Sequence, residues 1–94
     1  MDDKIECVEH ADGSKFWRKN GKFHRDDGPA AEWASGNKYW HQNDKLHRTD
    51  GPAIEFSNGS KEWWLYGKNY SFSEWCDELN LSQEEKCELV LIYG

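Results

Sequence analysis

Two histidines in this sequence each stand three residues before an aspartate, at His24/Asp27 and at His47/Asp50. A histidine beside a carboxylate can act as a general base in proton transfer. Both pairs lie in the same stretch, His-Arg-x-Asp-Gly-Pro-Ala, and no candidate nucleophile recurs beside them. Such repetition is typical of a structural device, in which Asp caps a turn, His and Arg bond backbone carbonyls and Gly takes a positive φ. We therefore predict no catalytic residue and no enzyme; a small histidine-dependent enzyme is the weakest alternative.

The three cysteines, Cys7, Cys76 and Cys87, raise the question of metal binding. The spacing of Cys7-x-x-His10 is that of one half of a zinc site, but no second Cys/His pair stands at a useful distance in the sequence. We expect neither a metal site nor a cofactor. An odd number of cysteines, without an apolar leader, is typical of reduced thiols and predicts a cytoplasmic protein.

The composition combines a very polar surface with many aromatic side chains. Of the 94 residues, 15% are aromatic and six are Trp, which is typical of a folded domain with an aromatic core. No run approaches the roughly 18 apolar residues of a membrane span. The net charge of −6 argues against nucleic acid as a partner. The charge is uneven, because residues 1–12 carry −4 and residues 73–94 carry −5, whereas residues 13–72 carry +3.

These residues lie in a sequence that repeats itself every 23 positions. Each unit contains Gly, Pro and Asp-Gly at close spacing, which disfavours helices. Short aromatic and β-branched runs between these turn signals predict successive β-hairpins. We expect an antiparallel meander of about five to six strands over residues 5–66. The positions in register include Gly13, Gly36 and Gly59, and also Trp17, Trp40 and Trp63.

Alternation along each expected strand assigns the side chains to two faces. We expect the repeated tryptophans to share the buried face with the apolar residues of the second strands, which are Val8, Ala31, Trp33, Ile54 and Phe56. The opposite face then mixes variable aromatics, bases and the glutamates Glu9, Glu32 and Glu55. A single sheet cannot cover its own apolar face, so it needs a further layer.

The C-terminal residues predict that cover as two short helices, over residues 73–79 and 82–92. Ser73 is expected to cap the first helix, and Ser82 forms a capping box with Glu85 at the second. The apolar end of the second helix can instead serve a partner or a homodimer. The side chains expected to dock on the sheet are Trp75, Leu79, Leu81, Cys87, Val90 and Leu91.

The expected fold is therefore mainly β, of the α+β class, with a short C-terminal helical segment packed on an antiparallel meander. We expect a single domain over residues 1–94. It consists of an acidic half repeat at 1–12, β-hairpin repeats at 13–70 and a helical cap at 71–94.

The repeat unit resembles the MORN repeat, a 23-residue β-hairpin. Residues Tyr39–Gly59 closely follow its pattern of an aromatic strand, Gly-Lys-x-His, Gly, a second strand and Asp-Gly. The His-Arg-x-Asp-Gly-Pro-Ala version, at 24–30 and 47–53, is similar to repeats in small bacteriophage and bacterial proteins. Asp44 stands where the pattern favours Gly, and the third unit lacks this stretch. The resemblance implies protein-binding or lipid-associated scaffolding and not a reaction.

Two surfaces are candidates for binding a protein partner. Aromatics interleaved with bases on the sheet suit a protein hot spot, although they also suit cross-strand stabilisation or the stacking of nucleobases. The glutamate ladder opposes the nucleobase alternative. The acidic helical tail suits a basic surface, or serves solubility alone. The candidates are Phe16, Arg18, Tyr39, His41 and Trp64 on the sheet, and Asp77, Glu78, Glu84, Glu85 and Glu88 in the tail.

We predict a non-enzymatic protein-binding repeat protein. The resemblance to phage repeats implies an inhibitor that covers a functional surface of a bacterial defence protein, such as an anti-CRISPR or another anti-nuclease inhibitor in the cytoplasm of a bacterial host. The alternative is a structural or homo-oligomeric interaction module, for example a homodimer through the C-terminal helix.

Overall fold

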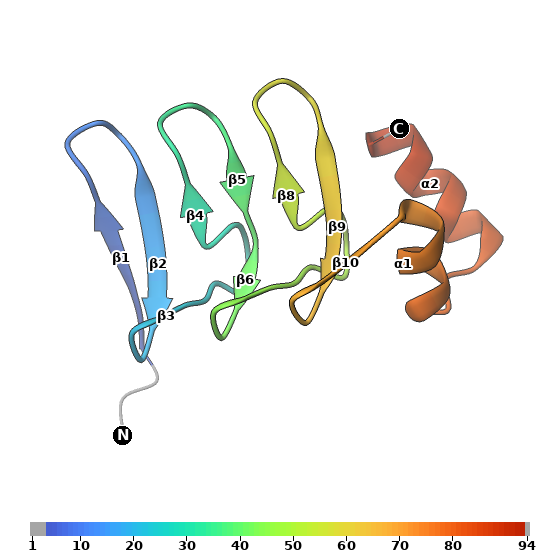
Figure 1. Ribbon diagram of the computed structural model, residues 1–94, viewed down its shortest axis with the longest axis horizontal. Coiled ribbons are helices and arrows are strands. Elements are labelled where there is room, and N and C mark those ends of the chain that lie inside the picture. The colour runs from blue at the N-terminus through green and yellow to red at the C-terminus, as the bar shows by residue number, and fades with distance from the viewer. Residues whose placement is uncertain (1–3, 94) are drawn as a thin grey trace.

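The computed structural model describes residues 4–93, so Asp2 and Asp3 of the acidic N-terminal segment lie outside the described residues. Three β-hairpins stand side by side and two helices follow at one end (Figure 1). The molecule measures 41 × 34 × 19 Å along its principal axes. The elements are β1 (Ile5–Glu9), β2 (Lys15–Lys19), β3 (Lys22–Phe23), β4 (Ala31–Glu32), β5 (Lys38–Tyr39), β6 (His41–Gln42), β7 (Lys45–Leu46), β8 (Ile54–Glu55), β9 (Lys61–Leu65), β10 (Lys68–Tyr70), α1 (Phe72–Glu78) and α2 (Gln83–Tyr93).

The strands form an antiparallel sheet in the order β1-β2-β4-β5-β8-β9-β10, with β3 paired to β2 and with β6 and β7 as a separate ribbon. The prediction of a mainly β meander with a packed C-terminal helical segment is confirmed. The expectation of five to six strands was too low. Each unit adds a second short hairpin beyond its tryptophan, which the sequence pattern does not separate from the first strand.

The second hairpin of each unit turns through two residues that both have positive φ. These pairs are Asn20-Gly21, Asn43-Asp44 and Tyr66-Gly67, and two left-handed residues are what the type I′ hairpin turn requires. Asp44 replaces Gly at this turn with a φ of 69°. Its carboxylate accepts a hydrogen bond from the Phe23 N–H at 2.9 Å, so this substitution ties the second unit to the first.

An arginine covers the repeated tryptophan in the first two units. The guanidinium carbon of Arg25 lies 3.8 Å from the Trp17 ring centre, and that of Arg48 lies 3.9 Å from the Trp40 ring centre. Each guanidinium also donates to a proline carbonyl and to a glutamate on the same face of the sheet. These hydrogen bonds join Arg25 to Pro29 and Glu32, and Arg48 to Pro52 and Glu55.

The glycines of the Asp-Gly-Pro-Ala turns leave space for these arginine side chains. The expectation that these glycines have positive φ was wrong. Gly28 and Gly51 are not among the residues with positive φ. A Cβ atom at Gly28 would lie 2.9 Å from the guanidinium carbon of Arg25, and one at Gly51 would lie 2.8 Å from that of Arg48. Only glycine leaves room for an arginine that lies this close to the backbone.

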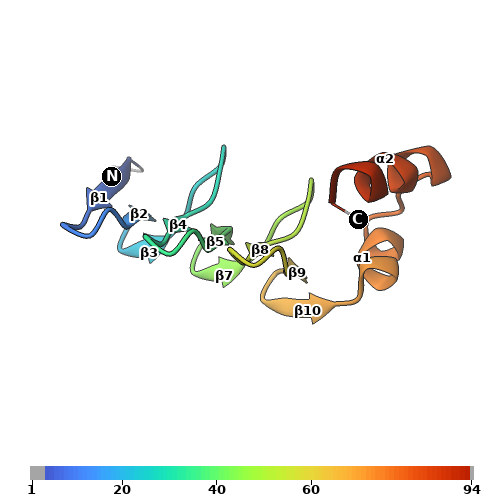
Figure 2. The same ribbon diagram turned by 90° about the horizontal axis from the view of Figure 1, so that it is seen from above.

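The helices pack mainly on the last unit, where no arginine follows Trp63, and they reach the second unit at Arg48. The Trp63 ring lies 4.6 Å from Trp75 and 4.8 Å from Phe72, measured between ring centres, and Tyr93 meets it edge-on at 5.9 Å. Trp75 is fully buried in this cluster. Figure 2, which views the sheet from above, shows both helices at the β9–β10 end and no helix over the strands of the first two units.

The helix boundaries agree with the sequence except at the first cap. Ser71, not Ser73, caps α1, in a capping box with Glu74. The predicted box of Ser82 and Glu85 is confirmed, because each side chain accepts from the backbone N–H of the other at 3.0–3.1 Å. The docking prediction was wrong for three residues, since Cys87, Val90 and Leu91 are exposed, whereas Leu89 packs on the cluster instead.

Candidate functional site

The strand register places the apolar residues on the face opposite the tryptophans. Phe16 pairs with Ala31, Ala31 with Tyr39, and Tyr39 with Ile54. Directly opposed residues share a face, so the predicted grouping of Val8, Ala31 and Ile54 with the tryptophans was wrong. Alternation places side chains within one strand correctly, but the register decides which faces of neighbouring strands coincide.

Seven rings are linked on this face, which we call the aromatic face. Phe16 lies at its centre, 5.0 Å from His10, 6.0 Å from Phe23 and 4.9 Å from Trp33, measured between ring centres. Tyr39 continues the contacts at 6.4–6.5 Å. Edge-on and tilted contacts of this kind hold the rings in fixed positions. The members of the aromatic face are His10, Phe16, Phe23, Trp33, Tyr39, His41 and Phe56.

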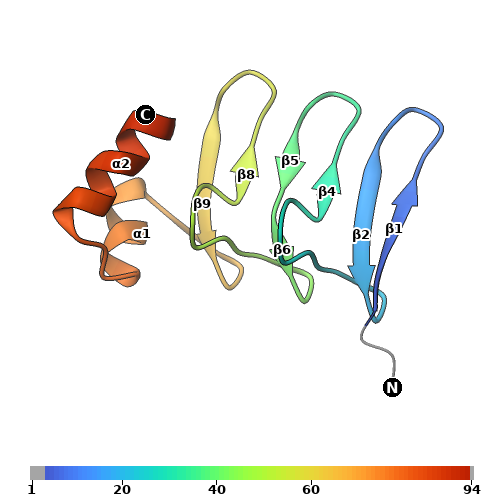
Figure 3. The ribbon, with the colours of Figure 1, turned by 180° about the vertical axis from the view of Figure 1, so that it is seen from behind.

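The aromatic face is partly open to solvent. Trp33 is 44% exposed, and Val8, in the same cross-strand row as Phe16, is 42% exposed. Figure 3, which shows the reverse side, likewise shows no helix over the first two hairpins. An uncovered apolar surface on a folded protein is a candidate site for another molecule.

The opposite face carries charge in strict alternation across the sheet. Lys15 pairs with Glu32, Glu32 with Lys38, Lys38 with Glu55 and Glu55 with Lys61. The tryptophans on this face lie beneath the arginines in the first two units. This face therefore combines covered aromatic rings with charges of alternating sign.

Of the predicted sheet-face candidates, four of five remain accessible. Arg18 is exposed, and its guanidinium lies over the Phe23 ring at 5.3 Å. Tyr39, His41 and Trp64 are half-buried, and the Trp64 indole donates to Glu62 at 2.9 Å. Phe16 is only 7% exposed, so the expectation of an exposed ring at this position was wrong. Phe16 holds the other rings in place.

Neither of the two His–Asp pairs that the sequence spacing suggests forms. His24 is buried and bonds Asp26, at 2.8 Å from its Nε2, while its Nδ1 accepts from the Asn43 N–H at 3.1 Å. His47 Nδ1 likewise accepts from the Tyr66 N–H at 3.0 Å. Asp27 and Asp50 instead bond Arg25 and Arg48. Each histidine therefore ties its turn to the next unit. The expectation that the histidines bond backbone carbonyls was wrong, because they accept from backbone N–H groups. Asp27 and Asp50 bond arginines and not the turn backbone that they were expected to cap.

Cys7 and His10 do not gain further ligands in the fold. Within residues 4–93, no three His, Cys, Asp or Glu side chains come together in a way that could hold a metal ion. Cys7 and Cys87 are exposed, and Cys76 is buried. In the same part of the chain, neither helix has the length and apolar character needed to cross a bilayer.

The five acidic tail candidates are all exposed. Two of them also make contacts within the helices. Glu85 completes the capping box of α2, and the Asp77 carboxylate lies 3.6 Å from the Lys86 Nζ. The hydrogen bonds to the Ser82 backbone and hydroxyl lower the pKa of Glu85. The tail therefore presents negative charge at neutral pH at the end of the molecule farthest from β1.

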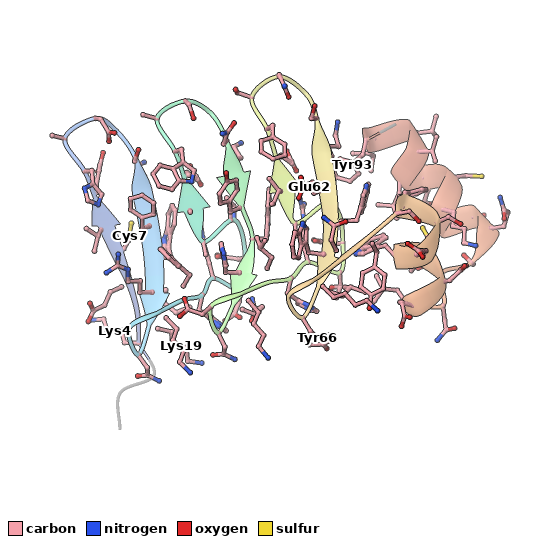
Figure 4. All side chains as sticks on the ribbon, viewed as in Figure 1. Lys4, Cys7, Lys19, Glu62, Tyr66 and Tyr93 are labelled. Atoms are coloured by element: carbon pink, nitrogen blue, oxygen red, sulfur yellow. The ribbon has the colours of Figure 1, made fainter. Side chains whose placement is uncertain are left out.

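Tyr66 is an exposed aromatic residue that the sequence reasoning missed. It occupies the turn position that Asn20 and Asn43 hold in the other units, and it has a φ of 51° and is 75% exposed. A left-handed conformation costs a non-glycine residue about 1–2 kcal/mol. The ring lies against His47 in a tilted contact, with 4.2 Å between ring centres, and lines a polar groove of about 750 Å³ with Arg48. Figure 4 shows it at the tip of the β9–β10 turn. The sequence signal that could have identified Tyr66 is that the two equivalent repeat positions hold asparagine.

Acidification from about pH 7.5 to about 5.5 is expected to lower the free energy of unfolding. Burial among Phe23 and Tyr39 lowers the pKa of His41, against the opposing effect of Asp44, and burial also lowers the pKa of His47. The unfolded chain then takes up these protons first. The neutral histidines therefore contribute their full stabilisation above the histidine pKa of the unfolded chain. This contribution is lost as the pH falls through the lower pKa values of His41 and His47 in the folded protein.

Urea denaturation at the two pH values measures this loss, and the variant His41→Phe should show a smaller one. Phenylalanine keeps the ring contacts and removes a buried Nδ1 that has no hydrogen-bond partner among the described residues. An equal loss in both proteins would contradict the assignment to His41. The carboxyl groups with lowered pKa, such as Glu74, titrate in a more acidic range.

Comparison of the chain with family models, with curated protein sequences and with solved structures gives no match.

Proposed function

We propose that this chain is a non-enzymatic protein-binding repeat protein and that its aromatic face is the binding surface. The observation that carries the proposal is a set of seven linked rings on a sheet face that no helix covers in the first two units. Aromatic anchors held rigidly lose little conformational entropy on binding, which makes them effective hot spots. The resemblance of the unit to MORN repeats supports the same class of function.

The finer form of the proposal is an inhibitor of phage type that covers a functional surface of a bacterial defence protein, such as an anti-CRISPR or another anti-nuclease inhibitor. Two features support it. The similarity of the His-Arg-x-Asp-Gly-Pro-Ala stretches to repeats in small phage proteins supports an inhibitor of phage type. The exposed acidic tail matches the basic surface by which a nuclease holds nucleic acid, and such complementarity speeds association.

One observation favours a second candidate, a homo-oligomeric module. Leu91 is 86% exposed, Ile92 69% and Val90 52%, all near the end of α2. Adjacent apolar side chains at this level of exposure suit a contact between two copies of the helix. The two candidates use different surfaces, so one pair of variants separates them.

Replacing Trp33 by alanine is expected to weaken partner binding by about 2 kcal/mol, roughly thirtyfold in Kd. Trp33 is 44% exposed and contacts Phe16 on the aromatic face, so its loss removes an anchor without opening the core. A partner is first isolated from bacterial lysate with the wild-type chain, and Kd is then measured by titration calorimetry. Far-UV circular dichroism checks that the variant is folded.

Leu91→Ala is the matched control, because it also removes an exposed apolar side chain. Unchanged binding in Leu91→Ala and weakened binding in Trp33→Ala support the aromatic face. The reverse pattern, together with self-association of the wild type in sedimentation, contradicts the proposal and favours the homo-oligomeric module.

A further inference from the structure

Strand β1 forms one edge of the sheet. Among the described residues it pairs with β2 alone, through five residue pairs from Ile5↔Lys19 to Glu9↔Lys15. Figure 3 shows β1 at the end opposite the helices, with no further strand beside it. An edge strand presents a row of unpaired backbone N–H and C=O groups along its outer side. The other end of the sheet is covered by α1 and α2, whereas no described element covers the outer side of β1.

The internal repeat shows what normally lies beside a strand of this kind. Strands β4 and β8 occupy the same position of the unit as β1, and each has a neighbour on both sides. In β4, Glu32 lies between Lys15 and Lys38, and Ala31 lies between Phe16 and Tyr39. In β1, the equivalent residues have the inner neighbour only. The missing neighbour is a strand with lysine followed by an aromatic residue, as in β2.

Burial measures what the missing neighbour would contribute. At one position of the unit, Ala31 is 2% exposed and Ile54 is 7% exposed, but Val8 is 42% exposed. Both buried residues have strands on either side, and Val8 has one. A second neighbour on β1 would therefore bury Val8 as its equivalents are buried, which is a favourable contribution to binding.

We propose that the outer edge of β1 accepts an extended basic segment of another protein as an additional antiparallel strand. The segment places lysine opposite Glu9 and an apolar or aromatic residue opposite Val8, and its backbone continues the ladder. Charge selects this occupant, because Glu6 and Glu9 are exposed on β1 and residues 1–12 carry −4. Two copies of β1 would bring these like charges together, which disfavours pairing with a second copy. This site borders the aromatic face, since Val8 lies in the same cross-strand row as Phe16, but it uses the backbone edge of β1 and not the seven rings.

The test uses a peptide from the chain's own strand β2 as a probe. A blocked synthetic peptide with the sequence of residues 14–19, which includes the strand that pairs with β4, is titrated into the full-length ¹⁵N-labelled protein. The expected result is saturable binding, with the largest amide shifts at residues 5–9 and slower hydrogen exchange there. The control peptide has proline in place of tryptophan. It keeps the charge but interrupts the ladder, and it should not bind.

Variants of the protein complete the test. Val8→Lys should weaken peptide binding about tenfold, through the loss of an apolar cross-strand pair and the repulsion of a basic peptide. Val90→Lys is the matched control, since Val90 is 52% exposed and lies in α2, and it should bind as wild type. The proposal is overturned by absence of saturable binding, by shifts centred on the aromatic face or the helices, by equal binding of the proline peptide, or by a dimer formed through β1 in sedimentation without peptide.

Discussion

Replacing Arg48 by alanine is expected to lower the free energy of unfolding by about 3–4 kcal/mol. The Arg48 side chain is only 13% exposed and donates to Glu55 at 2.9 Å and to the Pro52 carbonyl at 3.1 Å. It also covers the Trp40 ring and donates to the Tyr93 hydroxyl at 3.1 Å. Its removal leaves a partly buried carboxylate and carbonyl without their donor and uncovers an aromatic ring.

The other arginines of the sheet provide graded controls for this prediction. Arg25→Ala should cost about 2 kcal/mol, because its side chain is 23% exposed and its carboxylate contacts are longer. Arg18→Ala should change stability by no more than about 0.5 kcal/mol, because this side chain is exposed. Urea denaturation followed by tryptophan fluorescence gives all three values. If Arg48→Ala costs no more than Arg18→Ala, the arginines that cover the tryptophans do not stabilise the repeat units.

Replacing Trp75 by alanine is expected to cost about 4 kcal/mol. Trp75 is fully buried, its ring packs on Trp63 at 4.6 Å, and its indole N–H donates to the Arg48 carbonyl at 3.1 Å. Alanine would leave a cavity between the helices and β9, and an unpaired carbonyl. Because a protein of this size is stable by only about 5–10 kcal/mol, α1 and α2 should separate from the sheet or the whole chain should unfold well below the wild-type midpoint.

Trp33→Ala is the comparison for this second prediction. It removes the same side chain from a site that is 44% exposed, so it should cost about 1 kcal/mol. Circular dichroism during urea denaturation follows the helical signal separately from the fluorescence of the sheet. A Trp75→Ala variant with the wild-type midpoint in both signals would contradict the assignment of Trp75 as the residue that joins helices and sheet.

The 23-residue period was sufficient to predict the hairpins, because turn signals and tryptophans recur at one offset. The Ser82/Glu85 capping box likewise depends on residues three positions apart, so local sequence predicts it. The repetition of His-Arg-x-Asp-Gly-Pro-Ala correctly indicated a structural device. Which groups bond to which was not predictable, because His24 selects Asp26 and the backbone of the following unit, and these contacts depend on how two turns are placed in space.

The aromatic face could not be assembled from sequence for a related reason. Alternation places Phe16 opposite Trp17 within one strand, but the pairing of Phe16 with Ala31 depends on the register between hairpins. The docking side of α2 was ambiguous as well. Four consecutive apolar residues, 89–92, surround the helix and do not define one face.

Site-specific photo-crosslinking tests the central claim, that the aromatic face binds another protein, most directly. In one sample, p-benzoylphenylalanine replaces Trp33. In a second sample it replaces Lys38, which is an exposed residue of the charged face. Both samples are irradiated in bacterial cells. We expect an adduct with one protein other than this chain from position 33 and none from position 38. Equal adducts from both positions, or an adduct from position 33 with a second copy of this chain alone, would contradict it.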